Sequence, residues 1–144
     1  MRKLNLLLLV IVFACNSDDN AINSPIVGQW YLSQIKDNNT GNTRLPKDAN
    51  GIESTEKLYF LTFNSDGSIQ GKTLANDFSG NFSLSGRSDI SIDLELISEV
   101  LEPEDSDSYY YVDNLEGNLK YEIISGELYL HYDNNSKCFI FKTN

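Results

Sequence analysis

The chain has 144 residues, of which 11 are basic and 21 acidic, and its net charge at pH 7 is −10. This excess of acid argues against binding of nucleic acid, or of anionic lipid head groups by charge, because both depend on Lys and Arg. It favours solubility and a partner that is neutral or cationic.

Residues 1–14 have the order of a bacterial secretory signal peptide. Arg2 and Lys3 precede an apolar run, and a small residue stands just before Cys15. As a helix this run rises about 16 Å, against about 30 Å for a bilayer core, so it predicts no permanent membrane span. The sequence VFAC resembles a lipobox, which predicts cleavage before Cys15 and a palmitate-type lipid anchor on it. An ordinary signal peptide or a buried apolar N-terminus is the alternative.

Residues 15–25 are polar, acidic and without periodicity, which predicts a flexible tether behind the lipidated cysteine. The acidic pair Asp18-Asp19 resembles an export signal of lipoproteins, although an ordinary solvated linker has the same composition. We therefore expect a lipid-anchored protein of the outer membrane that faces the periplasm or the cell surface. Cleavage leaves 130 residues, with 9 basic and 21 acidic side chains. This length suits one domain, residues 26–144.

The domain shows repeated short strand patterns with turn signals between them. The segments are 26–32, 58–63, 69–72, 77–85, 90–96, 121–123, 128–132 and 138–141. Clusters such as NSDG and SG separate neighbouring segments and predict hairpin turns. The pattern predicts a mainly β fold, a single small antiparallel barrel or sandwich of about eight strands with one short helix.

Five residues are expected in the structural core. Trp30 anchors the first strand, and Phe60 lies in a run that is apolar on both faces, as in a central strand. Phe78, Gly80 and Phe82 share one face of the clearest alternating segment. A glycine on such a face indicates a close approach, here beneath a large ring such as that of Trp30.

Two polar stretches interrupt the strands and are the expected contact regions. Residues 37–55 are rich in Asn, Asp and Thr, which predicts a binding loop or a solvated insertion. Residues 101–108 hold Pro103 and several acids, which predicts a solvated loop whose Asp or Ser caps the next element, or a weak cation site. Apolar residues between Tyr111 and Leu119 have helical spacing, although the tyrosine triplet leaves room for a strand.

No residue pattern indicates catalysis, a metal or a cofactor. His131 is the only histidine, so a His-rich zinc site is not expected, and its strand position predicts an exposed side chain. Cys138 lies in an apolar strand and is expected to be a buried small hydrophobe rather than a reactive thiol. The sequence has no nucleophile elbow, phosphate-binding glycine loop or dinucleotide fingerprint. We expect that the protein is not an enzyme.

Several short motifs together resemble the META domain of HslJ-like lipoproteins. They are the opening IVGQWYL, the hairpin FNSDG, the segment NDFSGNF, and LYL with FIF near the end. The resemblance covers most of residues 26–142, but LAN stands before Asp77 where family members often have Gly-Cys-Asn, and the family disulfide is absent. It implies a small non-catalytic β domain of envelope proteins linked to stress response. By the same resemblance Trp30, Phe78, Gly80 and Phe82 are structural, and Asn76 is the most plausible binding residue.

Two functional hypotheses follow. The first is a non-catalytic, lipid-anchored envelope domain that binds another envelope protein or has a role in envelope stress. The alternative is a lipocalin-like carrier of a small apolar ligand, because an eight-stranded barrel can either be filled by its own side chains or hold one ligand. A barrel interior filled by side chains would favour the first hypothesis, and an apolar cavity inside the barrel would favour the second.

Overall fold

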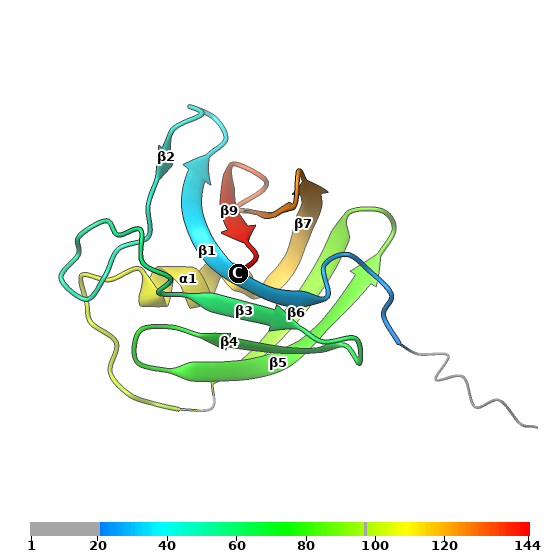
Figure 1. The fold of residues 1–144 in the computed structure, drawn as a ribbon, viewed down its shortest axis with the longest axis horizontal. Coiled ribbons are helices and arrows are strands. Elements are labelled where there is room, and N and C mark those ends of the chain that lie inside the picture. Colours follow the sequence, from blue (N-terminus) through cyan, green and yellow to red (C-terminus); the bar gives the residue numbers. More distant parts are fainter. Residues whose placement is uncertain (1–20, 97) are drawn as a thin grey trace, which may run out of the picture.

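Nine strands and one helix make up the described part of the chain, residues 21–96 and 98–144, in a computed structural model (Figure 1). The elements are β1 (Gly28–Asp37), β2 (Thr43–Arg44), β3 (Phe60–Phe63), β4 (Ser68–Lys72), β5 (Asp77–Ser85), β6 (Asp89–Leu96), α1 (Ser108–Leu115), β7 (Gly117–Ile124), β8 (Glu127–Tyr132) and β9 (Lys137–Lys142). The predicted signal peptide and the anchor Cys15 lie outside the described residues. The mainly β prediction is confirmed, and each of the eight predicted strands is present.

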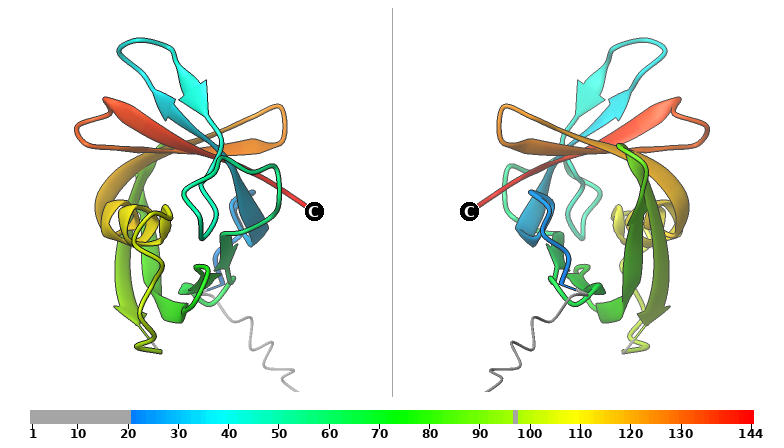
Figure 2. Two further views of the ribbon diagram at one scale, coloured as in Figure 1. Left: turned by 90° about the vertical axis from the view of Figure 1, so that its left-hand side faces the viewer. Right: turned by 90° about the vertical axis from the view of Figure 1, so that its right-hand side faces the viewer.

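The strands form one antiparallel sheet that closes on itself. Strands β3 to β9 pair in chain order, and β1 pairs with β3 on one side and β9 on the other (Figures 1 and 2). A register shift between Leu32 and Gln34 divides β1 into a half that pairs mainly with β3 and a half that pairs with β9. The result is a closed eight-stranded barrel, with short β2 added beside Ile35 and Lys36.

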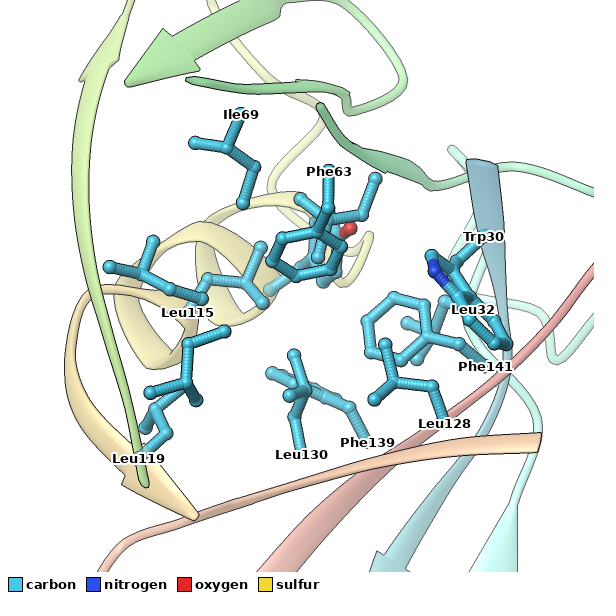
Figure 3. Close-up of a cluster of buried hydrophobic side chains, with 14 of the residues drawn as sticks. Trp30, Leu32, Phe63, Ile69, Leu115, Leu119, Leu128, Leu130, Phe139 and Phe141 are labelled. Carbon is cyan, nitrogen blue, oxygen red and sulfur yellow. The ribbon is translucent and has the colours of Figure 1, made fainter. Parts of the chain in front are cut away.

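The interior of the described barrel is filled by its own side chains. The buried cluster consists of Ile26, Trp30, Leu32, Ile35, Tyr59, Leu61, Phe63, Ile69, Phe78, Phe82, Ile90, Ile92, Tyr111, Leu115, Leu119, Leu128, Leu130, Tyr132, Phe139 and Phe141. Figure 3 shows labelled members from several strands and α1 pointing toward one another. Trp30 also donates its indole N–H to the carbonyl of Ile26 at 2.7 Å, so its polar atom is satisfied inside the core.

Phe60 is only half-buried, so its placement in the core was wrong. Its neighbours Tyr59 and Leu61 are both fully buried. The pairing with β1 explains the difference, because residues directly opposite in an antiparallel pair share a face. Leu61 pairs with buried Trp30, and Phe60 therefore pairs with Tyr31 on the outer face.

Gly80 does mark a close approach, but the group above it is not the Trp30 ring. A Cβ atom on Gly80 would lie 1.9 Å from the carbonyl oxygen of Asp93, in the backbone of β6. The glycine that lies beneath a ring is Gly71, where a Cβ would be 2.1 Å from the ring of Phe78. These two glycines let β4, β5 and β6 lie in contact without side chains in the way.

Helix α1 covers one end of the barrel and inserts two side chains into it. Tyr111 and Leu115 are both fully buried, and the Tyr111 ring lies 5.3 Å from Tyr59 and 5.6 Å from Phe139 between centroids. A helix was predicted here, but Leu119 does not belong to it and points into the core from β7. Among the described residues, no helix is long and apolar enough to cross a membrane.

The two ends of the barrel differ. At the helix end, α1 lies where β3, β5, β7 and β9 begin and β4, β6 and β8 end. At the opposite, turn end lie the tight turns of the β3–β4, β5–β6 and β7–β8 hairpins. The described chain starts at the turn end, where the Ile22 N–H donates to the carbonyl of Ser65 at 2.6 Å (Figure 1).

The variant Gly80→Ala should lower the free energy of unfolding by about 2 kcal/mol or more, because its new methyl group would collide with backbone that cannot rotate away. Urea denaturation of the purified variant measures this change. The control is Ser83→Ala, an exposed position on the same strand. Equal stability of the two variants would contradict the packing described for Gly80.

Candidate binding site

A pocket of about 470 Å³ lies at the helix end, outside the filled barrel interior. Its walls are Asn76, residues 98–102, and the side of α1 formed by Ser108, Tyr109, Val112 and Asp113. The volume falls within the range of small-molecule sites in proteins. The pocket therefore joins the start of β5, the β6–α1 connection and the helix.

Asn76 holds one wall of this pocket in place. Its Nδ2 donates to the Val100 carbonyl at 2.7 Å and to Glu102 Oε1 at 2.6 Å. Its Oδ1 accepts from Ser98 Oγ at 3.0 Å and from the Val100 N–H at 2.8 Å. The side chain is 5% exposed. Because its hydrogen-bonding groups already have partners within the chain, Asn76 shapes the predicted binding region rather than offering free polar atoms to a ligand.

Glu102 is the buried carboxylate of the pocket, with 4% of its surface exposed. Oε1 accepts from Thr73 Oγ1 and Asn76 Nδ2, and Oε2 accepts from the Ala75 N–H at 3.2 Å. Burial alone would raise the pKa of Glu102, but hydrogen bonding to the charged form by Thr73, Ser108, Asn76 and the Ala75 N–H outweighs it and lowers the pKa below its ordinary value. The carboxylate is therefore ionised at neutral pH.

Ser108 and Tyr109 begin the helical wall. Ser108 is fully buried, and its Oγ makes no hydrogen bond of normal geometry among the described residues. It lies close enough to Glu102, however, to help lower the pKa of that carboxyl. A buried hydroxyl that makes no hydrogen bond destabilises the folded state, because its lost hydrogen bonds to water are not replaced. Tyr109 is half exposed, and its hydroxyl accepts from the Glu102 N–H at 3.4 Å.

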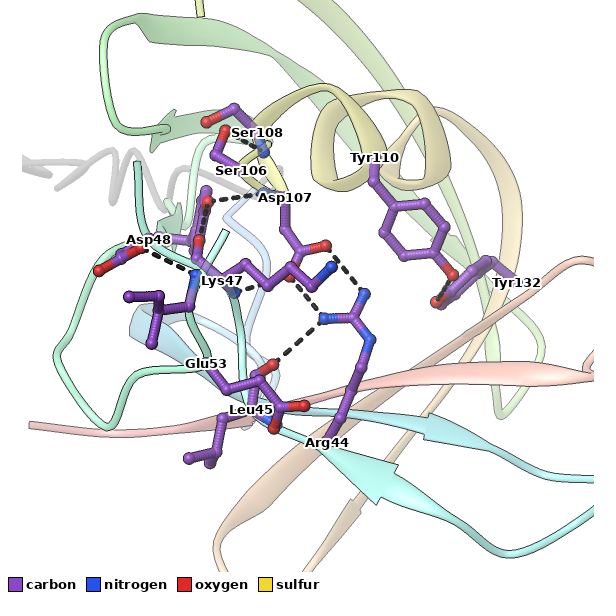
Figure 4. A network of polar contacts seen from close by, with 12 residues as sticks. Arg44, Leu45, Lys47, Asp48, Glu53, Ser106, Asp107, Ser108, Tyr110 and Tyr132 are labelled. Atoms are coloured by element: carbon purple, nitrogen blue, oxygen red, sulfur yellow. Dashed lines mark hydrogen bonds and ion pairs between the residues drawn. The ribbon is translucent and has the colours of Figure 1, made fainter. Parts of the chain in front are cut away.

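A second buried carboxylate, Asp107, fixes the start of α1. Its two oxygens accept from the guanidinium of Arg44 at 2.6 and 2.8 Å, and Oδ2 also accepts from the Lys47 N–H at 2.7 Å (Figure 4). The Tyr59 hydroxyl donates to the Lys47 carbonyl at 2.7 Å and accepts from the Asp107 N–H at 3.1 Å. The pair with Asp107 raises the pKa of Arg44, chiefly by hydrogen bonding.

These contacts change the interpretation of both polar stretches. Residues 37–55, predicted as a binding loop or a solvated insertion, contain β2 and the bridge between Lys47 and Glu53. Residues 101–108 are not wholly solvated, since Glu102 and Asp107 are buried. The residue at the N-cap position of α1 is Asp107, and its side chain makes no capping hydrogen bond to the helix. Ser106, one residue earlier, accepts from the Ser108 N–H through its Oγ at 3.2 Å. The bond between Arg44 and Asp107 brings both predicted contact regions together at the helix end.

His131 and Cys138, the side chains best suited to metal binding or nucleophilic chemistry, do not line the pocket. His131 is half-buried, not exposed, and its Nδ1 lies 3.1 Å from Asn38 Nδ2 while Nε2 lies 2.9 Å from Glu122 Oε1. Since the amide donates to Nδ1, the proton belongs on Nε2. Cys138 is fully buried, and burial raises the pKa of its thiol to about 12, so its prediction as a small hydrophobe is confirmed. The described residues contain no group of three or more side chains suited to hold a metal.

Comparison with known proteins identifies the fold. No protein-family model matches the chain, and no curated protein matches it. A lipocalin-like protein from Bacteroides uniformis is 26% identical, with a TM-score of 0.55, over 84% of this chain and 100% of the other. A DUF4847 family protein from Bacteroides vulgatus is 16% identical, with a TM-score of 0.58, over 83% and 94%.

A protein from Burkholderia xenovorans gives 17% identity and a TM-score of 0.57 over 81% of each chain. This chain therefore shares its barrel fold with lipocalin-like and DUF4847 proteins. The resemblance to META domains stays a prediction.

The variant Asp107→Asn should lower the free energy of unfolding by about 2 kcal/mol, because an amide cannot accept all the donors that Arg44 and Lys47 direct at the carboxylate. Thermal or urea unfolding measures the change. Asp105→Asn is the control, since Asp105 is an exposed acid in the same stretch. If both variants unfold alike, the Arg44–Asp107 contact does not hold the helix end together.

Glu102 should make the protein less stable in acid. A carboxylate whose pKa is lower in the folded state than its ordinary value of 4.5 contributes its stabilisation in full above that value. This stabilisation is lost as the pH falls through the pKa that Glu102 has in the folded protein. Between pH 6.5 and pH 3, wild-type protein should therefore lose more unfolding free energy than Glu102→Gln. Denaturant titrations across this range test the prediction, and parallel pH profiles would refute it.

Proposed function

We propose that this protein is a non-catalytic cell-envelope domain, anchored to the outer membrane through a lipid on Cys15, that binds its partner with the helix end of the barrel. The observation that carries the proposal is the position at which the described residues begin. Residue Ile22 is fixed against the β3–β4 turn, at the end opposite to α1. A tether anchored at Cys15 would therefore leave the helix end directed away from the membrane.

Exposed apolar side chains at the helix end support a contact surface there. Leu101 is 79% exposed, Val100 57% and Tyr109 49%, and all three line the pocket. Exposed apolar groups that gather around a pocket are typical of binding sites. The acidic surface favours a neutral or cationic partner, such as an envelope protein, over nucleic acid. The resemblance to META domains favours a role in envelope stress.

A lipocalin-like carrier of a small apolar ligand is the second candidate. The 26% identical lipocalin-like protein favours it. Side chains fill the described barrel interior, however, so the ligand would not lie at the barrel axis. The pocket between α1 and residues 98–102 is the place that the chain offers instead.

Site-specific photo-crosslinking in intact cells tests the proposal. A photoreactive amino acid replaces Leu101 at the helix end in one variant and Ile124 at the turn end in the other, since both side chains are exposed and apolar. We expect the variant at Leu101 to capture an envelope protein, because that end is directed away from the membrane. The variant at Ile124 should capture much less of it.

Labelling with a palmitate analogue checks the anchor in the same cells, with Cys15→Ser as the control. Equal capture by the two crosslinking variants would contradict the proposal that the partner binds at the helix end. Absence of label on the wild-type chain would contradict the anchor.

A further inference from the structure

We propose that the pocket at the helix end binds a small amphiphilic amine, with its ammonium group against Glu102 and Ser108 and its apolar body against Tyr109 and Val112. This inference rests on the proposed function, because it takes the helix end as the binding end. It adds the chemical class of the ligand. Three independent features of the pocket support it.

The first feature is charge. Glu99, Glu102 and Asp113 line the pocket, and no lining residue is basic. Glu102 is buried, and no cation forms an ion pair with it in the part of the chain that the structure describes. Taking a charge out of water is unfavourable unless an opposite charge or enough hydrogen bonds compensate it. A ligand cation would supply the missing charge.

The second feature is unused hydrogen-bonding capacity. Oε2 of Glu102 accepts only the Ala75 N–H, at 3.2 Å, whereas each carboxylate oxygen can accept two hydrogen bonds. Ser108 lines the same pocket, and its hydroxyl makes no hydrogen bond of normal geometry among the described residues, although it lies near the Glu102 carboxylate. An ammonium group has three N–H donors and no acceptor, so one group can serve both residues.

The third feature is the apolar part of the wall. Val100, Leu101, Tyr109 and Val112 surround a space of about 470 Å³, which is enough for a small molecule with an apolar body. The Tyr109 ring can also contact a cation through its face. A carboxylate or phosphate ligand would be repelled by the acidic lining, and a neutral apolar ligand would bury Glu102 further without compensating its charge.

Nuclear magnetic resonance titration of the full chain in lipid nanodiscs tests the inference with 2-phenylethylammonium. The neutral comparison ligand is 2-phenylethanol, and the anionic one is 3-phenylpropanoate. We expect the amine to shift the backbone resonances of residues 98–102 and 108–113. Its affinity should exceed that of the alcohol by at least about tenfold, because the ion pair adds a charge-assisted hydrogen bond. The anionic 3-phenylpropanoate should not bind.

Two variants locate the effect within the pocket. Glu102→Gln keeps the size of the side chain and should remove the preference for the amine over the alcohol. Ser108→Ala should weaken amine binding severalfold while changing stability little, because the deleted hydroxyl makes no hydrogen bond of normal geometry among the described residues. Glu104→Gln is the matched control, since it removes the same charge from an exposed position in the same connection.

The inference would be overturned if the amine and the alcohol bound equally well, or if 3-phenylpropanoate bound more tightly than the amine. Amine-induced resonance shifts that lie outside the pocket would overturn it as well. Should Glu102→Gln fail to fold, the Ser108→Ala and Glu104→Gln pair still decides it. The titration needs neither the anchor nor a protein partner. A negative result combined with capture at Leu101 would therefore reject the amine and leave the proposed function standing.

Discussion

Tyr111 holds α1 against the open end of the barrel, and the helix end depends on that contact. Its ring lies among Tyr59, Phe78, Phe139 and Phe141, and its hydroxyl donates to the carbonyl of Phe60 at 3.1 Å. Burial of a side chain of this size contributes about 2–3 kcal/mol. With Tyr111 fixed, residues 108–109 and 112–113 of the helix form one wall of the pocket, and the β6–α1 connection forms another.

Two buried carboxylates at the helix end have different surroundings. Asp107 pairs with Arg44 and accepts the Lys47 N–H, so its charge and its oxygens are largely used in joining α1 to residues 37–55. Glu102 accepts from neutral donors of Thr73, Ala75 and Asn76. Hydrogen bonds keep it ionised without an opposite charge nearby, which is the condition for attracting a cationic ligand. Asp107 thus has a structural role, whereas Glu102 has no ion-pair partner among the described residues.

Much of the barrel could be predicted from the sequence, because alternation and turn residues are local signals. Segment 77–85 shows strict alternation and coincides with β5 as observed. Phe60 lies in a run that is apolar on both faces, so only its pairing with Tyr31 across the sheet determines that it points outward. The short strand β2 has no apolar pattern and exists through pairing with β1.

The candidate site was harder to predict, because its residues are far apart in the sequence and come together only in the folded chain. Asn76 was singled out from a family resemblance, whereas Glu102 was one acid in an acidic stretch and gave no sign of burial. The donors that hold it, Thr73 and Asn76, are more than 20 residues away in the chain.

A crystal structure of the protein grown with 2-phenylethylammonium shows whether the pocket between α1 and residues 98–102 is a binding site. We expect the ammonium nitrogen to lie within hydrogen-bonding distance of Glu102 Oε2 and Ser108 Oγ, and the phenyl ring to lie against Val112. An amine bound in the barrel interior, or at the turn end, would show that the pocket is not the site.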